Sequence, residues 1–425
     1  MIKHFILVFI VLFFSFSNVF SQEIQEEIIQ EEIIEEEIVE EVVFEESSIA
    51  IPPRFSWEIS GNIQGDYRYF EEDGLYPGQE TEYFSSIFNP EIYVEWDNSN
   101  QLIQFEGFAR LNQYDIEQTH WDIRELYYQN IIANWELSVG KKQIYWGFTE
   151  SNHLVNIINQ DDLLEGNGVA NKLGQSMIHV SNYSEMGTFD VMLMRGFNPI
   201  QFPGAKGRLR PPFDVDYANT TYESEDGVDN TDFAIRWSHN INSIDLGVSH
   251  FNGTSRTPLI TSTDGVSFAP HYELIDQTGL ELQASLGSML WKLEAIQRKS
   301  DRKTIQAYTL GGEYTLVTQS GYDIGLLAEY NYDDRGAESI TGLNDDVFVG
   351  LRIALNDEQS TSFLGGMNKD NENGTISYFA EADRRLGNSW KIKVKAFGFK
   401  DVAENEFLYL LRKDGFVELS LVKYF

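Results

Sequence analysis

The sequence predicts an all-β fold, a transmembrane antiparallel β-barrel of about 18 strands. Segments that alternate apolar and polar residues recur along the chain, which indicates strands whose two faces meet unlike surroundings. Aromatic residues make up 14% of the chain, with 29 Phe and 21 Tyr, yet no segment after residue 21 is apolar for long enough to form a membrane helix. Short turns and long polar connections also alternate, as they do between the two rims of a membrane barrel.

Residues 1–21 are predicted to be a secretory signal peptide. Lys3 and His4 form a short basic start, Phe5–Phe16 an apolar core, and Ser21 a small residue before the cleavage site. The apolar core is short for a membrane-spanning helix, so a retained anchor is the weaker alternative.

Residues 22–53 are expected to form a flexible, acidic periplasmic extension ahead of a barrel of residues 54–425. Between Glu23 and Glu46, acidic clusters alternate with Ile and Val, without any Lys or Arg. Like charge at this density disfavours compact structure, and an acidic interaction tail is the alternative. The formal net charge of −36 argues against nucleic-acid binding, and the absence of cysteine excludes disulfides and thiolate chemistry.

Period-two alternation predicts the strands of the barrel. In chain order they are Phe55–Phe70, Phe88–Trp96, Ile103–Leu111, Trp121–Ile131, Asn134–Gln143, Ser176–Tyr183, Phe189–Phe197, Asp232–Ser238, Ile244–Phe251, Leu280–Leu286, Leu290–Arg298, Ile305–Leu316, Tyr322–Tyr332, Val347–Leu355, Phe363–Met367, Ile376–Asp383, Trp390–Phe399 and Gly415–Phe425.

Parity sets the strand count. Counting Glu406–Arg412 as a strand would leave the C-terminus on the outer side, whereas bacterial barrels have an even number of strands with both ends in the periplasm. Val402–Asp414 is therefore expected to be an outer loop with one helical turn. Sixteen strands is the alternative, because alternation is weak at Ser176–Tyr183 and Phe363–Met367. The periplasmic turns are expected to be short and the outer loops long.

The final strand carries a second indication. Val417, Leu419, Leu421 and Phe425 share one face. This ending resembles the closing-strand signature of bacterial outer-membrane barrels, whose terminal Phe is read by the barrel-assembly machinery. The resemblance implies location in the bacterial outer membrane, with its lipid and lipopolysaccharide as partners. An edge strand of a soluble sheet is the alternative.

A longer motif follows the fifth predicted strand. It has a Gly, a basic residue and Gln, then Trp-Gly, then an Asn and an Asp, and the residues that fit are Gly140, Lys141 or Lys142, Gln143, Trp146, Gly147, Asn159 and Asp161 or Asp162. The pattern resembles the signature of DUF1302, a family of porin-like proteins of unknown function, except that Gln160 replaces a proline. This resemblance implies a porin-like barrel but no particular substrate.

The connection 144–172 is long enough to be functional and rich in apolar residues. We expect it to fold inward and narrow the pore, with Asp161 and Asp162 pairing with Arg110 or Lys142; a loop packed at the outer rim is the alternative. The candidate pore and constriction residues are Lys142, Trp146, Asp161, Asp162, Arg110, Arg236, Arg352, Lys393, Glu381 and Asp383. Charges that merely pair across strands, as Lys391, Lys393 and Lys395 opposite Glu381 and Asp383 would, are the other interpretation.

These features favour an outer-membrane, porin-like channel for passive or facilitated diffusion of small polar or ionic solutes. A homo-oligomer is compatible with this function. An enzyme is not expected; an outer-membrane hydrolase with a rim Ser/His site would use His153, His179, His250 or His271, none of which lies in a nucleophile motif. A surface adhesin or assembly protein is a third class. No cofactor is expected, although the acidic loops Asp214–Asp232 and Asp333–Asp346 have the ligand chemistry of Ca²⁺ sites.

Overall fold

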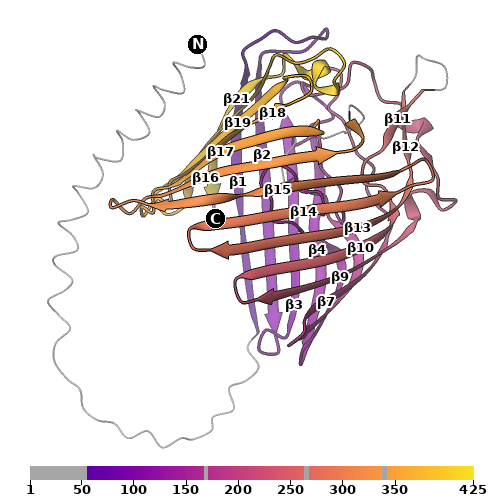
Figure 1. Cartoon of the computed structure of the whole chain (residues 1–425), viewed down its shortest axis with the longest axis vertical. Coiled ribbons are helices and arrows are strands. Elements are labelled where there is room, and N and C mark those ends of the chain that lie inside the picture. The colour runs from indigo at the N-terminus through magenta and orange to yellow at the C-terminus, as the bar shows by residue number, and fades with distance from the viewer. Residues whose placement is uncertain (1–54, 167–170, 263–267, 337–341) are drawn as a thin grey trace, which may run out of the picture. The chain divides into compact units, whose positions relative to one another are not determined.

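β-Strands make up most of the residues that the structure, a computed structural model, describes: 55–166, 171–262, 268–336 and 342–425. Eighteen strands form one sheet of antiparallel neighbours, in which β1 pairs with β2 on one side and with β21 on the other (Figure 1). The sheet therefore closes, and the predicted 18-strand barrel is confirmed. Its strands are β1 (Ser56–Phe70), β2 (Glu82–Trp96), β3 (Gln101–Asn112), β4 (His120–Ile132), β5 (Trp135–Lys142), β6 (Gln175–Ser184), β7 (Gly187–Arg195), β9 (Thr231–Ile241), β10 (Ile244–Thr254), β13 (Leu274–Leu286), β14 (Met289–Lys299), β15 (Thr304–Val317), β16 (Asp323–Asp333), β17 (Asp345–Ala354), β18 (Ser362–Asp370), β19 (Ile376–Leu386), β20 (Trp390–Lys400) and β21 (Phe416–Tyr424).

Neighbouring strands follow one another along the chain, so the connections alternate between two rims. One rim, which we call the turn rim, carries short turns such as residues 133–134 and 185–186. The other, the loop rim, carries the long connections 143–174, 196–230, 255–273 and 401–415. β1 begins and β21 ends at the turn rim, as parity predicted. The connection 401–415 contains a 3₁₀-helix, η4 (Phe407–Leu411), and no strand.

The loop rim also holds short elements that alternation did not predict. β8 (Thr221–Tyr222), β11 (Leu259–Thr261) and β12 (Ala269–Tyr272) form a separate three-stranded sheet, and η1 (Tyr217–Asn219) and η2 (Gly227–Asp229) flank β8. Such short strands do not contain enough residues to display a period of two. No helix in the described ranges is long and apolar enough to cross a membrane. The predicted signal peptide and acidic extension lie outside the described residues.

Two strands begin six residues earlier than predicted. β2 begins at Glu82 instead of Phe88, and β13 at Leu274 instead of Leu280. In β2 the extra residues continue the ladder with β1, in which Glu82 lies opposite Tyr69. A strand continues wherever its neighbour offers backbone partners, even when polar residues hide the alternation.

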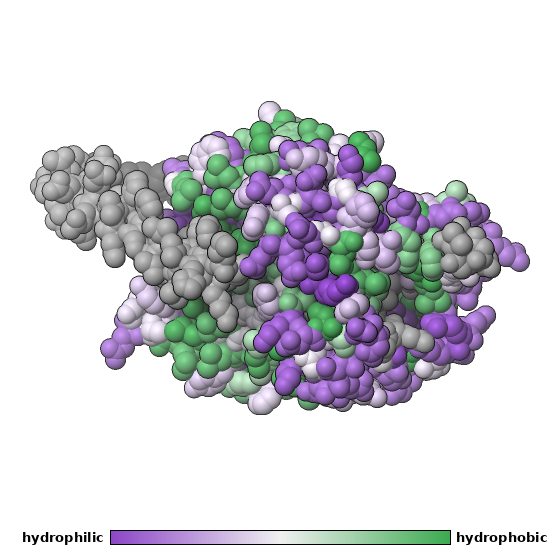
Figure 2. All heavy atoms as spheres, turned by 90° about the horizontal axis from the view of Figure 1, so that it is seen from above, coloured by the Kyte–Doolittle hydropathy of each residue, from purple (hydrophilic) through white to green (hydrophobic). Residues whose placement is uncertain are grey.

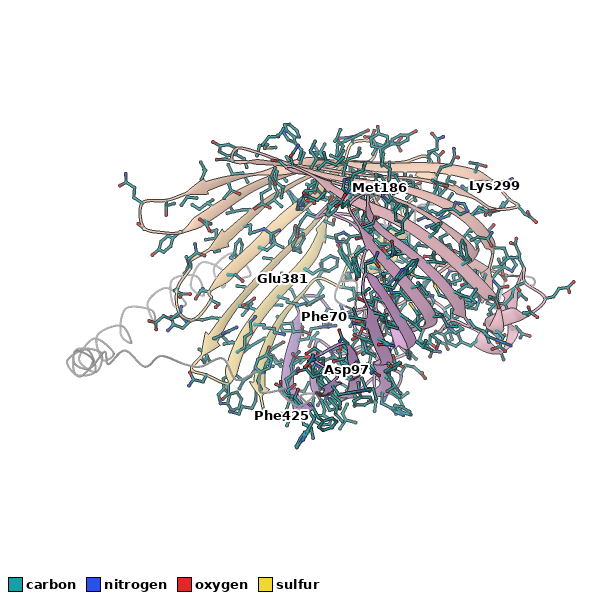
Figure 3. The ribbon with its side chains drawn as sticks, turned by 90° about the horizontal axis from the view of Figure 1, so that it is seen from below. Phe70, Asp97, Met186, Lys299, Glu381 and Phe425 are labelled. Atoms are coloured by element: carbon teal, nitrogen blue, oxygen red, sulfur yellow. The ribbon has the colours of Figure 1, made fainter. Side chains whose placement is uncertain are left out.

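The two faces of the barrel wall differ in polarity. Outward-facing Trp57 and Trp121 expose 64% and 76% of their surface, whereas inward-facing Asp66 and Arg110 are buried. Figure 2 shows hydrophobic residues along the flanks of the barrel and hydrophilic residues gathered over its middle. Figure 3, seen from below, shows Glu381 within the ring of strands. An apolar exterior around a polar interior is the layout of a membrane barrel.

Candidate functional site: the strap and the barrel interior

The connection between β5 and β6 folds into the barrel. Its residues 143–166, which we call the strap, form hydrogen bonds or ion pairs with inward-facing side chains of β13, β14, β16 and β17. β17 lies opposite β5, because eight strands separate them in either direction around the sheet. The strap therefore reaches from one wall of the barrel to the other.

Two wall carboxylates bind the backbone of the strap. Glu294 on β14 accepts hydrogen bonds from three strap N–H groups at 2.8–3.1 Å and from Thr149 Oγ1 at 2.6 Å. Glu329 on β16 accepts from the N–H and Oγ of Ser151 at 2.7 and 2.6 Å. A buried carboxylate is costly unless donors surround it, so the strap and these two side chains stabilise each other.

The side chain of Glu150 reaches the far wall. Its Oε2 lies 2.6 Å from a guanidinium nitrogen of Arg352 on β17 and 3.9 Å from Nζ of Lys292 on β14. Arg352 also lies 3.4 Å from Glu313 on β15. The far end of the strap is thus a group of alternating charges inside the barrel.

Apolar side chains of the strap are covered by the inner wall. The cluster joins Trp146, Leu154, Val155, Ile157 and Ile158 to inward-facing residues of β6 to β15, namely Met177, Met192, Met194, Ala234, Phe251, Ile275, Ile296 and Ala307. Burying one such large side chain contributes about 1.5–3 kcal/mol. The apolar residues that distinguish this connection in the sequence are therefore buried against the wall, and the interior along β6 to β15 is filled.

The residues of the sequence motif shape the start of the strap. Gly147 has φ +120°, and a Cβ there would lie 2.5 Å from Glu294 Oε1, so only glycine fits beside that carboxylate. Trp146 is buried beneath Arg236, whose guanidinium lies 5.9 Å from the ring centre. Asn159 ties the two ends together, since its Oδ1 accepts from Ile144 N–H at 2.7 Å and its Nδ2 donates to backbone carbonyls on both sides of the neck.

Ion pairs at β3 and β4 anchor the end of the strap. Arg110 Nε lies 2.7 Å from Glu165, and the Arg124 guanidinium binds Asp162. His120 Nε2 lies 3.5 Å from the same Asp162 carboxylate. Burial favours the neutral form of Asp162, but its hydrogen bonds with His120 and Arg124 and their charges outweigh burial and hold its pKa below the usual value.

The prediction of ion-pair partners for the two acidic motif residues, Asp161 and Asp162, was wrong. Neither Asp161 nor Asp162 pairs with Arg110 or Lys142. Asp161 pairs with Lys172, which lies opposite it in an antiparallel bridge that closes the neck of the connection. Lys142 lies instead 3.5 Å from Glu136 on its own strand.

Charges on the wall from β19 to β21 and β1 are paired. Lys391 lies 2.8 Å from Asp383, Lys395 lies 3.4 Å from Glu381, and Arg68 Nε donates to Glu418 at 2.7 Å. Lys393 lies between the two paired lysines on β20, with Asp383 and Ser420 as its cross-strand neighbours. Cross-strand pairing therefore accounts for most of these charges.

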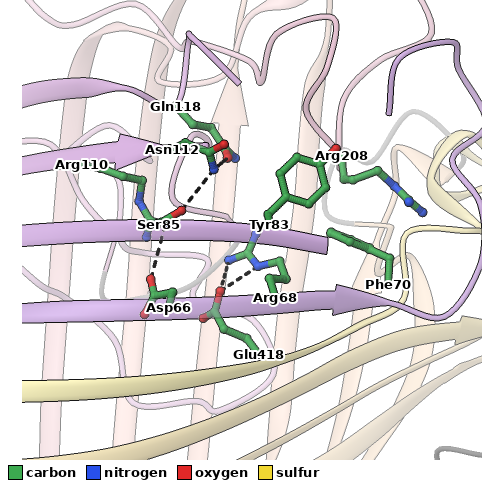
Figure 4. A pocket seen from close by; sticks show the side chains of 10 residues that line it. All are labelled: Asp66, Arg68, Phe70, Tyr83, Ser85, Arg110, Asn112, Gln118, Arg208 and Glu418. Carbon is green, nitrogen blue, oxygen red and sulfur yellow. Dashed lines mark hydrogen bonds and ion pairs between the residues drawn. The ribbon is translucent and has the colours of Figure 1, made fainter. Parts of the chain in front are cut away.

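A small polar cavity lies against β1, β2, β3 and β21 (Figure 4). Arg68, Arg110 and Glu418 line it, and Arg208 covers it from the loop rim, with its guanidinium 4.2 Å from the Phe70 ring centre. Arg208 is held by Asp414 at 2.7 Å and by carbonyl groups of the loop-rim connections 71–81 and 401–415. The cavity lies beside the end of the strap, because Arg110 and Gln118 in its lining bond Glu165 and Leu164. Open interior lies next to β19 and β20, where Glu381 and Lys395 expose about half of their side chains.

The structure brings only some of the candidate residues together. Trp146 of the strap packs against Arg236 on β9, which also pairs with Glu281, and Arg352 binds the far end of the strap. Lys393, Glu381 and Asp383 lie on β19 and β20, outside the contacts of the strap. The residues that fix the strap and were not candidates are Glu150, Glu294, Glu329, His120, Arg124 and Glu165. Nothing in the local sequence distinguishes them from other polar residues, because their partners are distant in the chain.

The cluster at His179 does not have the arrangement of a hydrolytic triad. His179, Ser181 and Asp190 do cluster, but His179 Nε2 contacts both Ser181, at 3.0 Å, and Asp190, at 2.9 Å. A hydrolytic triad needs the Ser and the Asp on opposite nitrogens of the ring. Ser181 Oγ also donates directly to Asp190 at 2.6 Å, so these groups form a polar cluster on the inner wall.

One group in the described residues has the composition of a metal site. Ligand atoms of His120, Asp162 and Glu165 lie within 4.8 Å of one another. Arg124 and Arg110 already neutralise the two carboxylates, which leaves little negative charge for a cation. The acidic loops considered for Ca²⁺ form no such group in the described ranges.

Outer-membrane porins of known structure have a similar architecture. No protein-family model and no curated protein matches the chain. Among solved structures, a BenF-like porin from Pseudomonas fluorescens is similar over 87% of this chain and 98% of its own, with TM-score 0.51 and 9% identity. Pseudomonas aeruginosa OccK2, solved in complex with glucuronate, is similar over 87% of this chain and 95% of its own, with TM-score 0.50 and 12% identity.

The fold is that of an outer-membrane porin. At these identities the likeness to porins concerns the fold alone. Since no family model matches, the resemblance of residues 137–163 to the DUF1302 signature remains a prediction.

Proposed function

We propose that this chain is a porin-like channel of the bacterial outer membrane through which small polar or ionic solutes diffuse. The observation that carries the proposal is the strap, which fills the interior along β6 to β15 and contacts β17 on the far wall. Solutes would pass through the remaining part, between the strap and the charged walls of β1 to β3 and β19 to β21. The strap, within the connection 144–172, is the constriction.

The outer surface supports the same proposal. Aromatic side chains on the outer face, such as Trp291 and Trp390 near the turn rim and Trp121 and Tyr332 near the loop rim, suit the two interfaces of a bilayer. In this environment the partners are membrane lipid and lipopolysaccharide, with the assembly machinery acting on the strand that ends in Phe425. No observation favours an enzyme or an adhesin over a channel.

Single-channel recording in planar bilayers tests both parts of the proposal. The parent protein should conduct, and deletion of Ser151–Leu164 should raise the conductance and weaken discrimination between solutes. A parent that inserts without conducting would refute the channel, and a folded deletion variant that conducts like the parent would refute the constriction.

Two double variants test the constriction with the strap at its full length, so the test does not depend on the folding of the deletion variant. Ser151 Oγ lies 3.4 Å from Asn331 Oδ1 on β16, and the chain has no cysteine, so Ser151→Cys with Asn331→Cys would introduce one pair of thiols whose oxidation tests a covalent link between strap and wall. The oxidised variant should conduct like the parent. Ser151→Ala with Glu329→Ala removes the side-chain hydrogen bonds to β16 and should increase current fluctuations.

A further inference from the structure

Aromatic side chains form a line on the inner wall near the loop-rim ends of β17, β19 to β21, β1 and β2. We call them the aromatic arc: Tyr83 on β2, Phe70 on β1, Phe416 on β21, Phe397 on β20, Phe379 on β19 and Phe348 on β17. Each lies within four residues of the loop-rim end of its strand. On β18, between Phe379 and Phe348, the inward position belongs to Gly366, and a Cβ there would meet the Phe348 ring at 2.3 Å. This glycine lets the Phe348 ring lie flat on the wall.

The rings contact one another along the arc. Centre-to-centre distances are 5.7 Å for Tyr83–Phe70, 5.7 Å for Phe70–Phe416 and 5.9 Å for Phe416–Phe397. Phe397 lies directly opposite Phe379 in the strand register. Phe379 and Phe348 are 6.2 Å apart with their planes at 3°. The arc therefore spans seven neighbouring strands, six of which carry a ring, while β18 carries Gly366.

Only part of the arc is available to a solute. Phe70, Tyr83 and Phe348 are buried, whereas Phe379, Phe397 and Phe416 are half-buried and face the interior. Arg68 already lies over Phe416, 4.5 Å from its centre. The rings of Phe379 and Phe397 are consequently the two on which a solute would stack.

Polar groups lie two residues further into the barrel on the same strands. Lys395 lies below Phe397, Glu381 below Phe379 and Glu418 below Phe416. These are the charges of the Lys395–Glu381 and Arg68–Glu418 pairs. Because each cation has its own carboxylate, an ionic solute would have to compete with an existing pair. A neutral polyol could accept hydrogen bonds from the cations and donate to the carboxylates while both pairs persist.

We infer that the aromatic arc is a saccharide-binding site on the path of the solute. The apolar face of a pyranose ring would stack on Phe379 and Phe397, and its hydroxyl groups would bond Lys395 and Glu381. This inference rests on the proposed channel, since the site lines the part of the interior that the strap leaves open. It narrows the solute class from small polar or ionic compounds to neutral sugars.

The test adds maltohexaose to one side of a bilayer that contains the full-length protein. The sugar should block the current reversibly, with an apparent affinity that Phe397→Ala and Phe379→Ala each weaken by about 3- to 10-fold. Phe397→Tyr should keep the block, because it keeps the ring. Leu364→Ala is the matched control, since Leu364 faces inward on β18 opposite Glu381 and loses apolar volume without a ring.

Three outcomes would overturn the inference. The first is an open channel that maltohexaose does not block; the second is a block that the alanine variants leave unchanged, which would reflect solute size alone. The third is a block by sodium benzoate but not by the sugar, which would assign the arc to aromatic acids. If the protein does not conduct, calorimetric titration of the folded, detergent-solubilised barrel with maltohexaose tests the binding site without the channel. Binding that Phe397→Ala weakens would support the site, and no binding would refute it.

Discussion

Gly147 occupies the most restricted position of the strap. Its φ of +120° and the 2.5 Å that would separate a Cβ from Glu294 exclude any other residue without movement of that carboxylate. The carboxylate is fully buried and accepts four hydrogen bonds from the strap. A Trp-Gly pair at this place is explained by two neighbours, since Trp146 fills the space against the wall and Gly147 leaves room for Glu294.

Glu150 should control the ion selectivity of the channel. Glu150→Gln keeps the shape of the side chain but leaves Arg352 and Lys292 facing the interior without their shared carboxylate. One unit charge at about 4 Å in water changes the energy of an ion by about 1 kcal/mol, so chloride permeability relative to potassium should rise about fivefold. The zero-current potential in a KCl gradient measures this ratio. Glu185→Gln, in an exposed turn at the turn rim, is the control with the same change of charge; equal ratios in both variants would contradict the assignment.

At the scale of elements, three kinds of contact hold the strap against the barrel wall. Wall carboxylates bind its backbone, an apolar cluster buries its underside, and ion pairs with β3 and β4 hold its end. These contacts respond differently to pH. His153, near the tip, is half-buried, and its desolvation lowers its pKa to about 4.

Acidification should therefore loosen the tip of the strap. A released strap would return the pKa of His153 to about 6.5, so between about pH 6.5 and pH 4 the released form binds more protons than the docked form. The contribution of neutral His153 to docking is complete above pH 6.5 and is lost as the pH falls toward 4. Asp162, whose pKa is lowered, stays ionised over this range and keeps the neck attached.

The measurement is current noise in bilayers between pH 7 and pH 4.5. Noise should rise on acidification in the parent and much less in His153→Gln. His250→Gln, on the half-exposed outer face of β10, serves as the control. A parent whose noise is independent of pH would show that His153 does not report strap docking.

The sequence predicted the strands better than the contacts inside them. Alternation located all 18 strands because each has one apolar and one polar face, and parity placed Val402–Asp414 in a loop. The apolar residues of 144–172 also indicated a segment that needs cover. The identity of its partners could not be predicted: Glu294 and Glu329 look like any inward-facing acid, and the choice of Glu165 over Asp162 as partner of Arg110 depends on the path of the folded connection.

At the scale of the whole molecule, the barrel closes between β1 and β21. Gly61 and Phe425 exchange two backbone hydrogen bonds, of 3.2 and 3.1 Å, and the Phe425 ring stacks on Phe88 with centres 6.2 Å apart. Gly61 permits this contact, since its φ is +150° and a Cβ would lie 3.0 Å from that ring.

Deletion of Phe425 should lower the amount of folded barrel. It removes two backbone hydrogen bonds, each worth about 0.5–1.5 kcal/mol, together with the contact of the ring at the seam. Folded protein is measured as the fraction that migrates differently before and after heating in a denaturing gel. Phe425→Tyr keeps the backbone and the ring and should fold like the parent. Equal yields from the deletion and the parent would mean that the seam does not depend on this residue.

The seam also fixes the order of events in folding. β1 and β21 are the most distant strands of the barrel along the chain. The edge of β1 that faces away from β2 is covered by β21, and the edge of β21 that faces away from β20 is covered by β1. Every assembly intermediate with fewer than all strands in place must keep two exposed edges, and the longest loop closure comes at the final step. The barrel should therefore become resistant to protease in a single late event, while its earlier strand pairs remain open to exchange.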